Sequence, residues 1–252
     1  MLKKSGKNKN CYEGESIDIE CALSECLSHA KKFRFEIESL PVESLELIAL
    51  KKIRKNAKRR IYISAGIHGD EPAGPLALQE LLKENEWPKD ASLWIFPCLN
   101  PSGFLAKTRE SGTKDLNRDY LHLETPEIRA HTEWLQKEPD FDLTLCLHED
   151  WEAKGFYLYE AKKETHPSLA EEIIEEVKKI FPIDRSRQID GYPAKAGVIR
   201  SFCDCDSFEF WPEAIYLCQK KQSLNYTLET SSDFPLESRV KALVAAIKAA
   251  IK

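Results

Sequence analysis

The sequence of 252 residues has no apolar run approaching the roughly 20 residues that a membrane-spanning helix requires. It also lacks a secretory signal, because the basic residues 1–10 are followed by the acidic segment CYEGESIDIE rather than by an apolar stretch. Glycine and proline are sparse, at 10 and 13 residues, whereas 42% of the residues are apolar, which argues against a disordered or fibrous chain. We therefore expect a globular, cytoplasmic protein.

An extended basic surface is also missing from the charge pattern. The 37 basic and 42 acidic residues are interleaved and give a net charge of −5. Binding to a phosphate backbone depends on clustered Lys and Arg, so we expect neither nucleic acid nor a membrane as a partner.

Cysteine is present, but without the compact spacing of a disulfide-rich fold. The eight cysteines are scattered through the chain. Cys98, Cys146 and Cys218 lie in apolar, strand-like runs and are predicted to be small buried side chains. Cys203 and Cys205 form the one close pair, and a pair without a matching second half is a weak indication of zinc.

Short strand-like runs alternate with amphipathic helical stretches. Eight runs are typical of strands: FRFEIESL, LELIALKKI, RRIYISAGI, SLWIFPCL, DLTLCL, GFYLYE, AIYLCQ and NYTLET. Helical periodicity is clearest in GPLALQELLKEN, PEIRAHTEWLQKE, SLAEEIIEEVKKI and PLESRVKALVAAIKAAIK, the last with Asp233 as its expected N-cap. The alternation predicts an α/β fold, a three-layer α/β/α sandwich around a mixed, mostly parallel sheet of about eight strands.

The length fits a single domain over residues 1–252, with 1–32 as a candidate N-terminal extension. The stretch from about 183 to 212 has little periodicity and is predicted to be a long excursion. Such excursions often form the wall of a binding site.

The segment IYISAGIHGDEPAG is the first with evident chemistry. His68 ends an apolar strand and Glu71 follows just before a helix, so both side chains can face one point beyond the strand. Imidazole nitrogen and carboxylate oxygen are common zinc ligands, and a catalytic zinc site uses three protein ligands and one open position. A third ligand is therefore expected from elsewhere in the chain.

His148 is the best candidate for this third ligand. It ends the apolar run DLTLCL, much as His68 ends its own run. The other four histidines lie in polar or helical settings that are typical of solvated side chains: His29, His122, His131 and His166. Asn100 and Glu229 likewise follow apolar runs. Ligands of open α/β sheets bind beyond the carboxyl ends of the strands, where these residues are expected to lie.

The polar segment KTRESGTKDLNRDY lies between these strand ends. It carries Arg109 followed by Asn117 and Arg118. Two guanidinium groups with an amide between them suit recognition of a carboxylate or stabilisation of an oxyanion, because Arg offers fixed, paired donors. A charged surface loop is the alternative interpretation.

Together these segments resemble the zinc carboxypeptidase superfamily, which also includes succinylglutamate desuccinylase and aspartoacylase. The matching motifs occur in the family's order: HGDE at 68–71, NPSG at 100–103, TRESGTKDLNRDY at 108–120, LHE at 147–149 and LET at 228–230. The resemblance implies the fold of the zinc carboxypeptidases for this chain.

The resemblance also implies that His68, Glu71 and His148 bind one Zn²⁺ ion. Bound zinc lowers the pKa of water from 15.7 to roughly 7, so that a nearby carboxylate can take its proton at neutral pH. Glu149 and Asp150, next to His148, either orient that ligand or face water.

Four further roles follow from the same resemblance. Arg109 would polarise the scissile carbonyl, and Asn117 and Arg118 would hold the terminal carboxylate of the substrate. Glu229 would serve as general base and acid.

One departure from the superfamily concerns a mobile tyrosine, which its digestive carboxypeptidases place upstream of the base. SFCDCDSFEFWPEA fills that region, and Tyr192 and Tyr216 stay unassigned. Acidic residues of this region form either a pocket for a basic side chain or a solvated loop: Asp204, Asp206, Glu209 and Glu213.

Three functions are compatible with this pattern. The first is a metallocarboxypeptidase or peptide amidase, similar to bacterial murein peptide amidases. The second is an N-acyl-amino-acid deacylase of the aspartoacylase or succinylglutamate desuccinylase type, with the same zinc and catalytic residues. The third is a binding protein that has lost turnover. HEDWEAKGFYLYE favours the peptidase branch, and the expected partner is a peptide or N-acyl amino acid with a free carboxylate.

Overall fold

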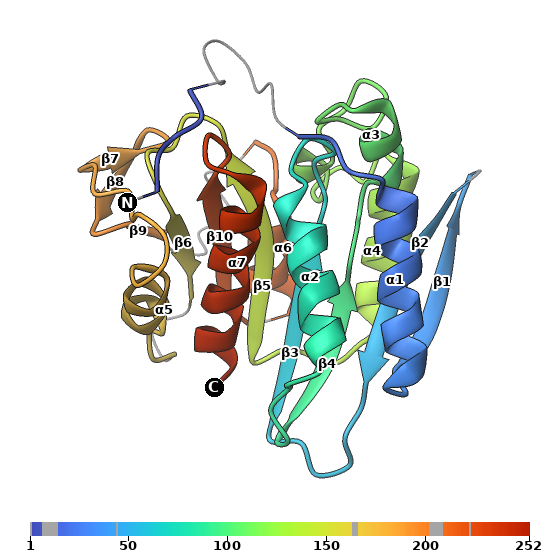
Figure 1. Cartoon of the computed structure of the whole chain (residues 1–252). Helices are drawn as coiled ribbons and strands as arrows, with labels where there is room; N and C mark the ends of the chain where they lie inside the picture. Colours follow the sequence, from blue (N-terminus) through green and yellow to red (C-terminus); the bar gives the residue numbers. More distant parts are fainter. Residues whose placement is uncertain (1, 7–14, 44, 163–165, 202–208, 222) are drawn as a thin grey trace.

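A ten-stranded mixed sheet forms the middle layer of the protein (Figure 1). The computed structural model describes residues 2–6, 15–43, 45–162, 166–201, 209–221 and 223–252. The strand order is β1-β2-β4-β3-β5-β10-β6-β9-β8-β7. The strands are β1 (Glu36–Val42), β2 (Leu45–Lys52), β3 (Arg59–Ala65), β4 (Ala91–Phe96), β5 (Leu143–Asp150), β6 (Tyr157–Ala161), β7 (Gln188–Ile189), β8 (Tyr192–Lys195), β9 (Val198–Ser201) and β10 (Leu224–Ser231).

The centre of the sheet is parallel. β4, β3, β5 and β10 are neighbours in that order and run in the same direction. Every residue of β4 is buried, and so is every residue of β5 except the last. Continuous apolar runs of this kind belong to strands that are covered on both faces. The carboxyl ends of these four strands therefore meet at one edge of the sheet.

Helices cover both faces of the sheet. They are α1 (Ile19–Lys32), α2 (Ala73–Glu84), α3 (Pro101–Ala106), α4 (Pro126–Lys137), α5 (Ala170–Val177), α6 (Glu213–Lys220) and α7 (Leu236–Ile251), with a short 3-10 helix, η1, at Leu116–Arg118. In Figure 1, α1, α2, α7 and α5 form the layer in front of the sheet, and α4 and α6 lie behind it. The predicted three-layer α/β/α sandwich with a mixed sheet is confirmed, with ten strands rather than about eight. The sheet is not mostly parallel, because parallel pairing is confined to the β4-β3-β5-β10 centre and to β6 with β9.

The additional strands come from the stretch predicted as an excursion, where β7, β8 and β9 extend the sheet beyond β6. One predicted strand is wrong, because the AIYLCQ run lies in helix α6. A short apolar run is compatible with either period. Glu213, the first residue of α6, lies beside Asn117 at the carboxyl edge of the central strands, whereas β10 begins at the other edge. Helix α6 connects these two edges behind the sheet.

The N-terminal part contributes to the helical layer in front of the sheet. Asp18 caps α1 by accepting the Cys21 N–H at 2.9 Å, and Cys26 and Ala30 of this helix are buried in the larger hydrophobic core. The predicted N-cap of α7 is wrong. Pro235 occupies that position, and Asp233 instead accepts hydrogen bonds from residues 5 and 6. These contacts attach the start of the chain to the end of β10.

The predicted burial of cysteines is confirmed for Cys98 and Cys146, whose thiols are free. The prediction is confirmed for Cys218 as well, which is buried and in addition disulfide-bonded. The predicted close pair, Cys203 and Cys205, lies outside the described residues.

Among the described residues, no helix combines the length and the apolar character needed to cross a membrane.

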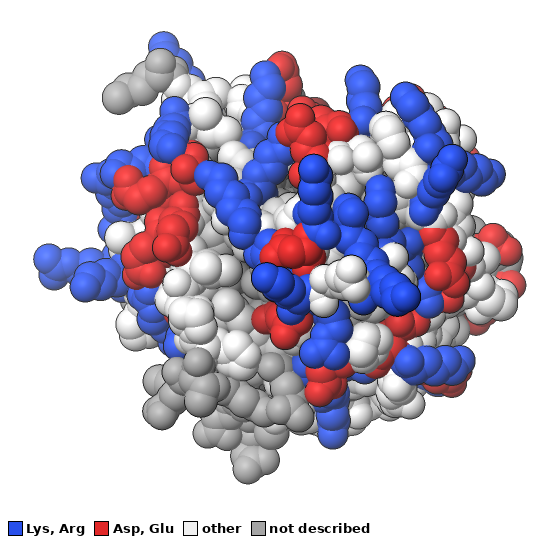
Figure 2. Space-filling view, turned by 90° about the horizontal axis from the view of Figure 1, so that it is seen from below, with Lys and Arg blue, Asp and Glu red and all other residues white. Residues whose placement is uncertain are grey.

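Figure 2 shows from below the edge of the sheet opposite the carboxyl ends of the central strands, where many Lys and Arg side chains lie with Asp and Glu among them. α1, α2, α4, α6 and α7 all end at this edge and carry a basic residue in their last turn: Lys32, Lys83, Lys137, Lys220 and Lys248. A cation near a helix C-terminus is favourable by about 0.3–1 kcal/mol. Helix direction therefore accounts for the position of these five lysines.

Candidate metal centre and active site

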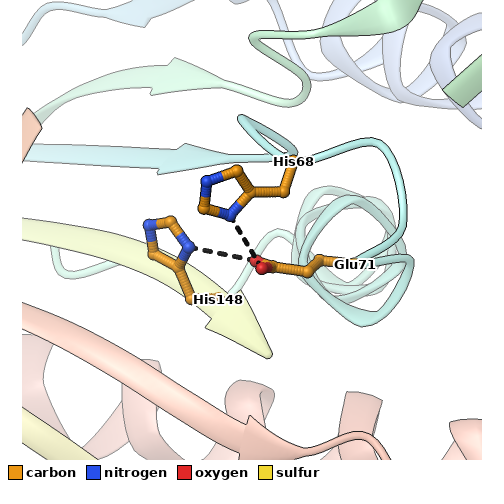
Figure 3. Close-up of side chains that lie close together, drawn as sticks. All are labelled: His68, Glu71 and His148. Atoms are coloured by element: carbon orange, nitrogen blue, oxygen red, sulfur yellow. Dashed lines mark hydrogen bonds and ion pairs between the residues drawn. The ribbon is translucent and has the colours of Figure 1, made fainter. Parts of the chain in front are cut away.

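Three buried side chains converge at the carboxyl edge of the central strands (Figure 3). His68 follows β3, Glu71 precedes α2, and His148 lies in β5. The Nδ1 atom of His68 lies 2.7 Å from one oxygen of the Glu71 carboxylate, and Nδ1 of His148 lies 3.0 Å from the other. One ligand atom from each residue lies within 4.8 Å of the other two. The structure thus brings together the three residues that the sequence predicts as metal ligands.

The chemistry of this donor set fits a metal ion. Two imidazole nitrogens and one carboxylate make up the protein ligands of several catalytic zinc sites, which keep a fourth position open. Both histidines present the same ring nitrogen, Nδ1, to the centre of the cluster. The geometry therefore suits a single ion held by His68, Glu71 and His148.

The protonation states of the cluster also suit a metal. Burial disfavours the charged Glu71 carboxylate, but the adjacent His68 and His148 hold its pKa well below the usual range. Burial lowers the pKa of His148, against the opposing effect of Glu71. For His68, the carboxylates of Glu71 and Asp115 outweigh burial and raise the pKa. Metal ligands must be deprotonated, a condition that Glu71 and His148 already meet at neutral pH.

Asp115 holds the outer side of the His68 ring and was not assigned from the sequence. One of its carboxylate oxygens lies 3.0 Å from His68 Nε2. The same oxygen accepts the Asn117 N–H at 2.8 Å. A carboxylate behind a metal-binding histidine fixes the ring orientation and tautomer. Its position within the DLNR motif was the available sequence signal.

Two motif glycines permit close approach of the loops around the site. A Cβ on Gly69 would lie 2.1 Å from the carbonyl carbon of Gly103, and a Cβ on Gly103 would lie 2.5 Å from the Asn100 amide nitrogen. Asn100 is fully buried, and its amide donates to the carbonyl oxygens of Ile67 at 3.1 Å and Arg109 at 3.3 Å. Asn100 therefore ties the His68 turn to the Arg109 loop rather than facing the centre of the site.

Arg109 reaches the metal cluster from the neighbouring loop. Its side chain is 43% exposed, and one terminal nitrogen lies 2.8 Å from the Glu71 carboxylate. Its Nε lies 3.8 Å from Asp115. The guanidinium thus borders the three metal-site residues and remains open to solvent.

Asn117 and Arg118 lie in η1, beside Asp115. The Asn117 side-chain oxygen accepts the backbone N–H of Glu213 at 2.9 Å. This bond occupies the oxygen of the amide and leaves its nitrogen as a donor for another group. Arg118 is exposed and donates to the Asn117 carbonyl oxygen at 3.0 Å.

Glu229 completes the group of strand-end residues. It is the partner of His148 in the parallel pairing of β10 with β5, and of Tyr157 in the antiparallel pairing with β6. None of the described residues forms a hydrogen bond with its half-buried carboxylate. Burial, reinforced by the carboxylates of Glu71 and Asp150, raises the pKa of Glu229 well above its usual value. Such a carboxylate accepts a proton readily.

His131 was predicted to be solvated, and this is wrong. It is fully buried, with Nε2 2.9 Å from the Tyr62 hydroxyl and Nδ1 2.8 Å from the Tyr120 hydroxyl. Tyr62 also donates to Glu213 at 2.8 Å. A helix has a buried face, and the sequence alone did not place His131 on it.

The acidic residues and tyrosines considered in the sequence analysis lie in different environments. Glu213 is buried and accepts hydrogen bonds from Tyr62 and Ser64, so it is unavailable to a substrate. Glu209 is exposed, whereas Asp204 and Asp206 lie outside the described residues. Tyr216 is buried, and Tyr192 is exposed with its ring 6.3 Å from that of Tyr159.

Comparison with known proteins supports this picture. Residues 57–174 match the family model of the succinylglutamate desuccinylase/aspartoacylase catalytic domain. This range includes the three metal-site residues and the Arg109–Arg118 loop but ends before Glu229. No curated protein matched the sequence.

Solved structures match over most of the chain. A candidate metallopeptidase from Shewanella amazonensis SB2B is 24% identical, with a TM-score of 0.80 over 92% of this chain and 91% of that one. A metallo-carboxypeptidase from Pseudomonas aeruginosa, in complex with (2-guanidinoethylmercapto)succinic acid, is 19% identical, with a TM-score of 0.65 over 90% and 66%. An aspartoacylase family protein from Mesorhizobium loti is 17% identical, with a TM-score of 0.55 over 85% and 66%. These matches confirm the fold.

Proposed function

We propose that the chain is a zinc metallohydrolase that cleaves the amide bond next to a terminal carboxylate, as a carboxypeptidase or peptide amidase does. The observation that carries this proposal is the convergence of His68 and His148 on the Glu71 carboxylate, with Glu229 paired directly beside His148. We also propose that residues 1–252 act as a single catalytic domain, because the sheet extends over residues 36–231 and helix Ile19–Lys32 shares its core.

In this proposal His68, Glu71 and His148 would hold one zinc ion, which would supply the activation of a water molecule near neutral pH. Glu229 is the base that takes the proton, since its carboxylate lies at the same level of the sheet as His148 and makes no hydrogen bond with the described residues. The same residue then returns the proton to the leaving nitrogen. Burial raises the pKa of Glu229, which makes its carboxylate a better proton acceptor than an exposed one.

The loop from Arg109 to Arg118 would recognise two polar groups of the substrate, the carbonyl oxygen of the reacting amide and the terminal carboxylate. Arg109 borders Glu71 and would stabilise the negative charge that develops on the carbonyl oxygen. The Asn117 amide nitrogen and the Arg118 guanidinium would hold the terminal carboxylate of the substrate. The succinic acid derivative in the similar Pseudomonas aeruginosa enzyme also carries carboxylates.

A deacylase that acts on N-acyl amino acids is the second candidate. The match of residues 57–174 to the succinylglutamate desuccinylase/aspartoacylase catalytic domain favours it. The same metal-site and basic residues would serve this reaction, because its substrate also combines an amide with a carboxylate. The two candidates differ in which side of the amide carries the recognised carboxylate.

A substrate panel tests both candidates with the zinc-loaded protein. Short peptides with acidic, basic and aromatic C-terminal residues, including D-amino acids, would be compared with N-acetyl and N-succinyl amino acids. Release of the C-terminal residue from peptides supports the carboxypeptidase. Hydrolysis of only the acyl amino acids would exclude it in favour of the deacylase. Absence of hydrolysis across the panel by zinc-loaded protein would contradict both.

A further inference from the structure

Glu149 follows the predicted metal ligand His148 but points to the other face of the sheet. Successive side chains of a strand alternate between faces, and the contacts of Glu149 lie in the layer of α2 and α7. The side chain is buried. Its surroundings settle the choice that the sequence left open, because it faces protein rather than water.

The carboxylate of Glu149 caps helix α2. Pro72 occupies the N-cap position of this helix and makes no side-chain cap, and the first turn contains no acidic residue. One oxygen of Glu149 accepts the Ala73 N–H at 2.6 Å. The N–H groups of a first helical turn have no partner within the helix and favour a negative charge. The cap of α2 is thus supplied by the strand that carries His148.

A second contact joins the same two segments closer to the metal site. The backbone N–H of Glu149 donates to the Glu71 carboxylate at 3.1 Å, on the oxygen that also lies 3.0 Å from His148 Nδ1. Glu149 therefore contacts the segment that carries Glu71 at two points: at the Glu71 carboxylate and at the Ala73 N–H. Together they set the position of Glu71 relative to His148.

Arg239 of α7 supplies the positive charge that this buried carboxylate needs. Arg239 is 0% exposed and forms ion pairs with Glu149 and with Glu15. A buried carboxylate is costly unless it is paired and hydrogen-bonded. The pair offsets part of the cost of burying Glu149 and connects the cap of α2 to α7.

We propose that Glu149 is a positioning residue that holds Glu71 in place as a metal ligand by capping α2 from β5. The proposal rests on the metal site of the proposed function. A positioning role differs from a purely stabilising ion pair in what metal affinity requires. Metal affinity then depends on the acceptor for the Ala73 N–H and not on the charges of Glu149 and Arg239.

Two double variants separate these effects. E149A/R239L removes the acceptor together with both charges, which avoids leaving one charge buried alone. E149Q/R239L also removes both charges but restores an amide oxygen at the same distance from the backbone. Glu15→Gln is the matched control, because it removes the other partner of Arg239 and leaves Glu149 unchanged.

The measurement is the affinity of each metal-free protein for zinc, by competition with a chelator of known affinity, with circular dichroism and thermal unfolding to confirm folding. Loss of a residue behind a metal ligand typically weakens binding by roughly 10–100-fold. We expect this loss for E149A/R239L, with affinities close to wild type for E149Q/R239L and Glu15→Gln. Amide hydrogen exchange at Ala73 should become faster in E149A/R239L alone.

Two results would overturn the inference. Folded E149A/R239L that binds zinc as tightly as wild type would show that the cap does not position Glu71. An equal loss in both double variants would assign the effect to charge or packing rather than to the acceptor. Wild-type protein that binds no zinc would instead overturn the proposed function, and the inference with it.

Discussion

Glu229 lies directly beside His148, because the two residues are partners in the parallel pairing of β10 with β5. Their side chains leave the sheet on the same face and at the same level. A parallel pair of strands thus delivers an imidazole of the candidate metal site and a carboxylate to the same place, although 80 residues separate them along the chain.

The first prediction concerns Glu229→Gln. The amide has nearly the shape of the carboxylate but cannot take a proton, so turnover should fall by roughly 10²–10⁴-fold. Zinc content should stay at the wild-type level, because Glu229 is not among the three converging ligands. Steady-state kinetics and elemental analysis provide the measurement, with the exposed Glu209→Gln as control. Turnover retained by Glu229→Gln would mean that another group is the base.

The second prediction concerns metal loading. His68→Ala and His148→Ala should each purify with little zinc and no activity, since each removes one of three protein ligands. His122→Ala is the matched control, because His122 is exposed. A chelator should abolish wild-type activity, and added zinc should restore it. A near absence of zinc in wild type, together with no effect of His68→Ala on any activity, would favour a binding protein without turnover.

The third prediction concerns Arg109→Ala. Removal of one donor to a developing oxyanion typically lowers kcat by roughly 10²–10³-fold, and we expect this loss with a smaller change in KM. Arg60→Ala is a matched control, because its side chain is 44% exposed, against 43% for Arg109, and lies at the start of β3, at the opposite edge of the sheet. A change confined to KM would indicate that Arg109 binds the substrate and does not stabilise charge on the carbonyl oxygen.

The fourth prediction concerns stability and pH. Burial lowers the pKa of His131 to about 3, whereas an unfolded histidine titrates near pH 6.5, as a rough reference. Between these values the unfolded state binds a proton that the folded state does not, so stability should fall as the pH falls. Against His131→Gln, the wild type should lose up to about 1.4 kcal/mol of unfolding free energy per pH unit in this range.

Urea unfolding of both proteins at several pH values from about 7 down to 4 tests this difference. Effects of all other titrating groups that are shared by the two proteins cancel in the comparison. A difference in unfolding free energy that stays constant with pH would show that the pKa of His131 is the same in the folded and unfolded states.

Much of the candidate site was predictable from local patterns. His68, His148 and Glu229 each end an apolar run, and the carboxyl ends of parallel strands meet at one edge of a sheet. These positions needed no knowledge of which strands are neighbours. The helices α2, α4 and α7 were predictable for a similar reason, because apolar residues that recur every three or four positions can be recognised within one segment.

Local patterns failed where the outcome depended on packing. The AIYLCQ run is short enough to fit a strand or a helix, and the return to the start of β10 decided for α6. His131 lies on a helix whose buried face meets Tyr62 and Tyr120, which come from other parts of the chain.

Residue type and strand pattern are local properties, so the order of the amino acids is enough to identify the chemical groups of the site and to show that they follow apolar runs. How those groups are held depends on the tertiary structure. Asp115 meets His68 across 47 positions, and Glu149 meets Arg239 across 90. Such contacts leave no periodic trace in the chain, since they depend on where whole strands and helices come to lie.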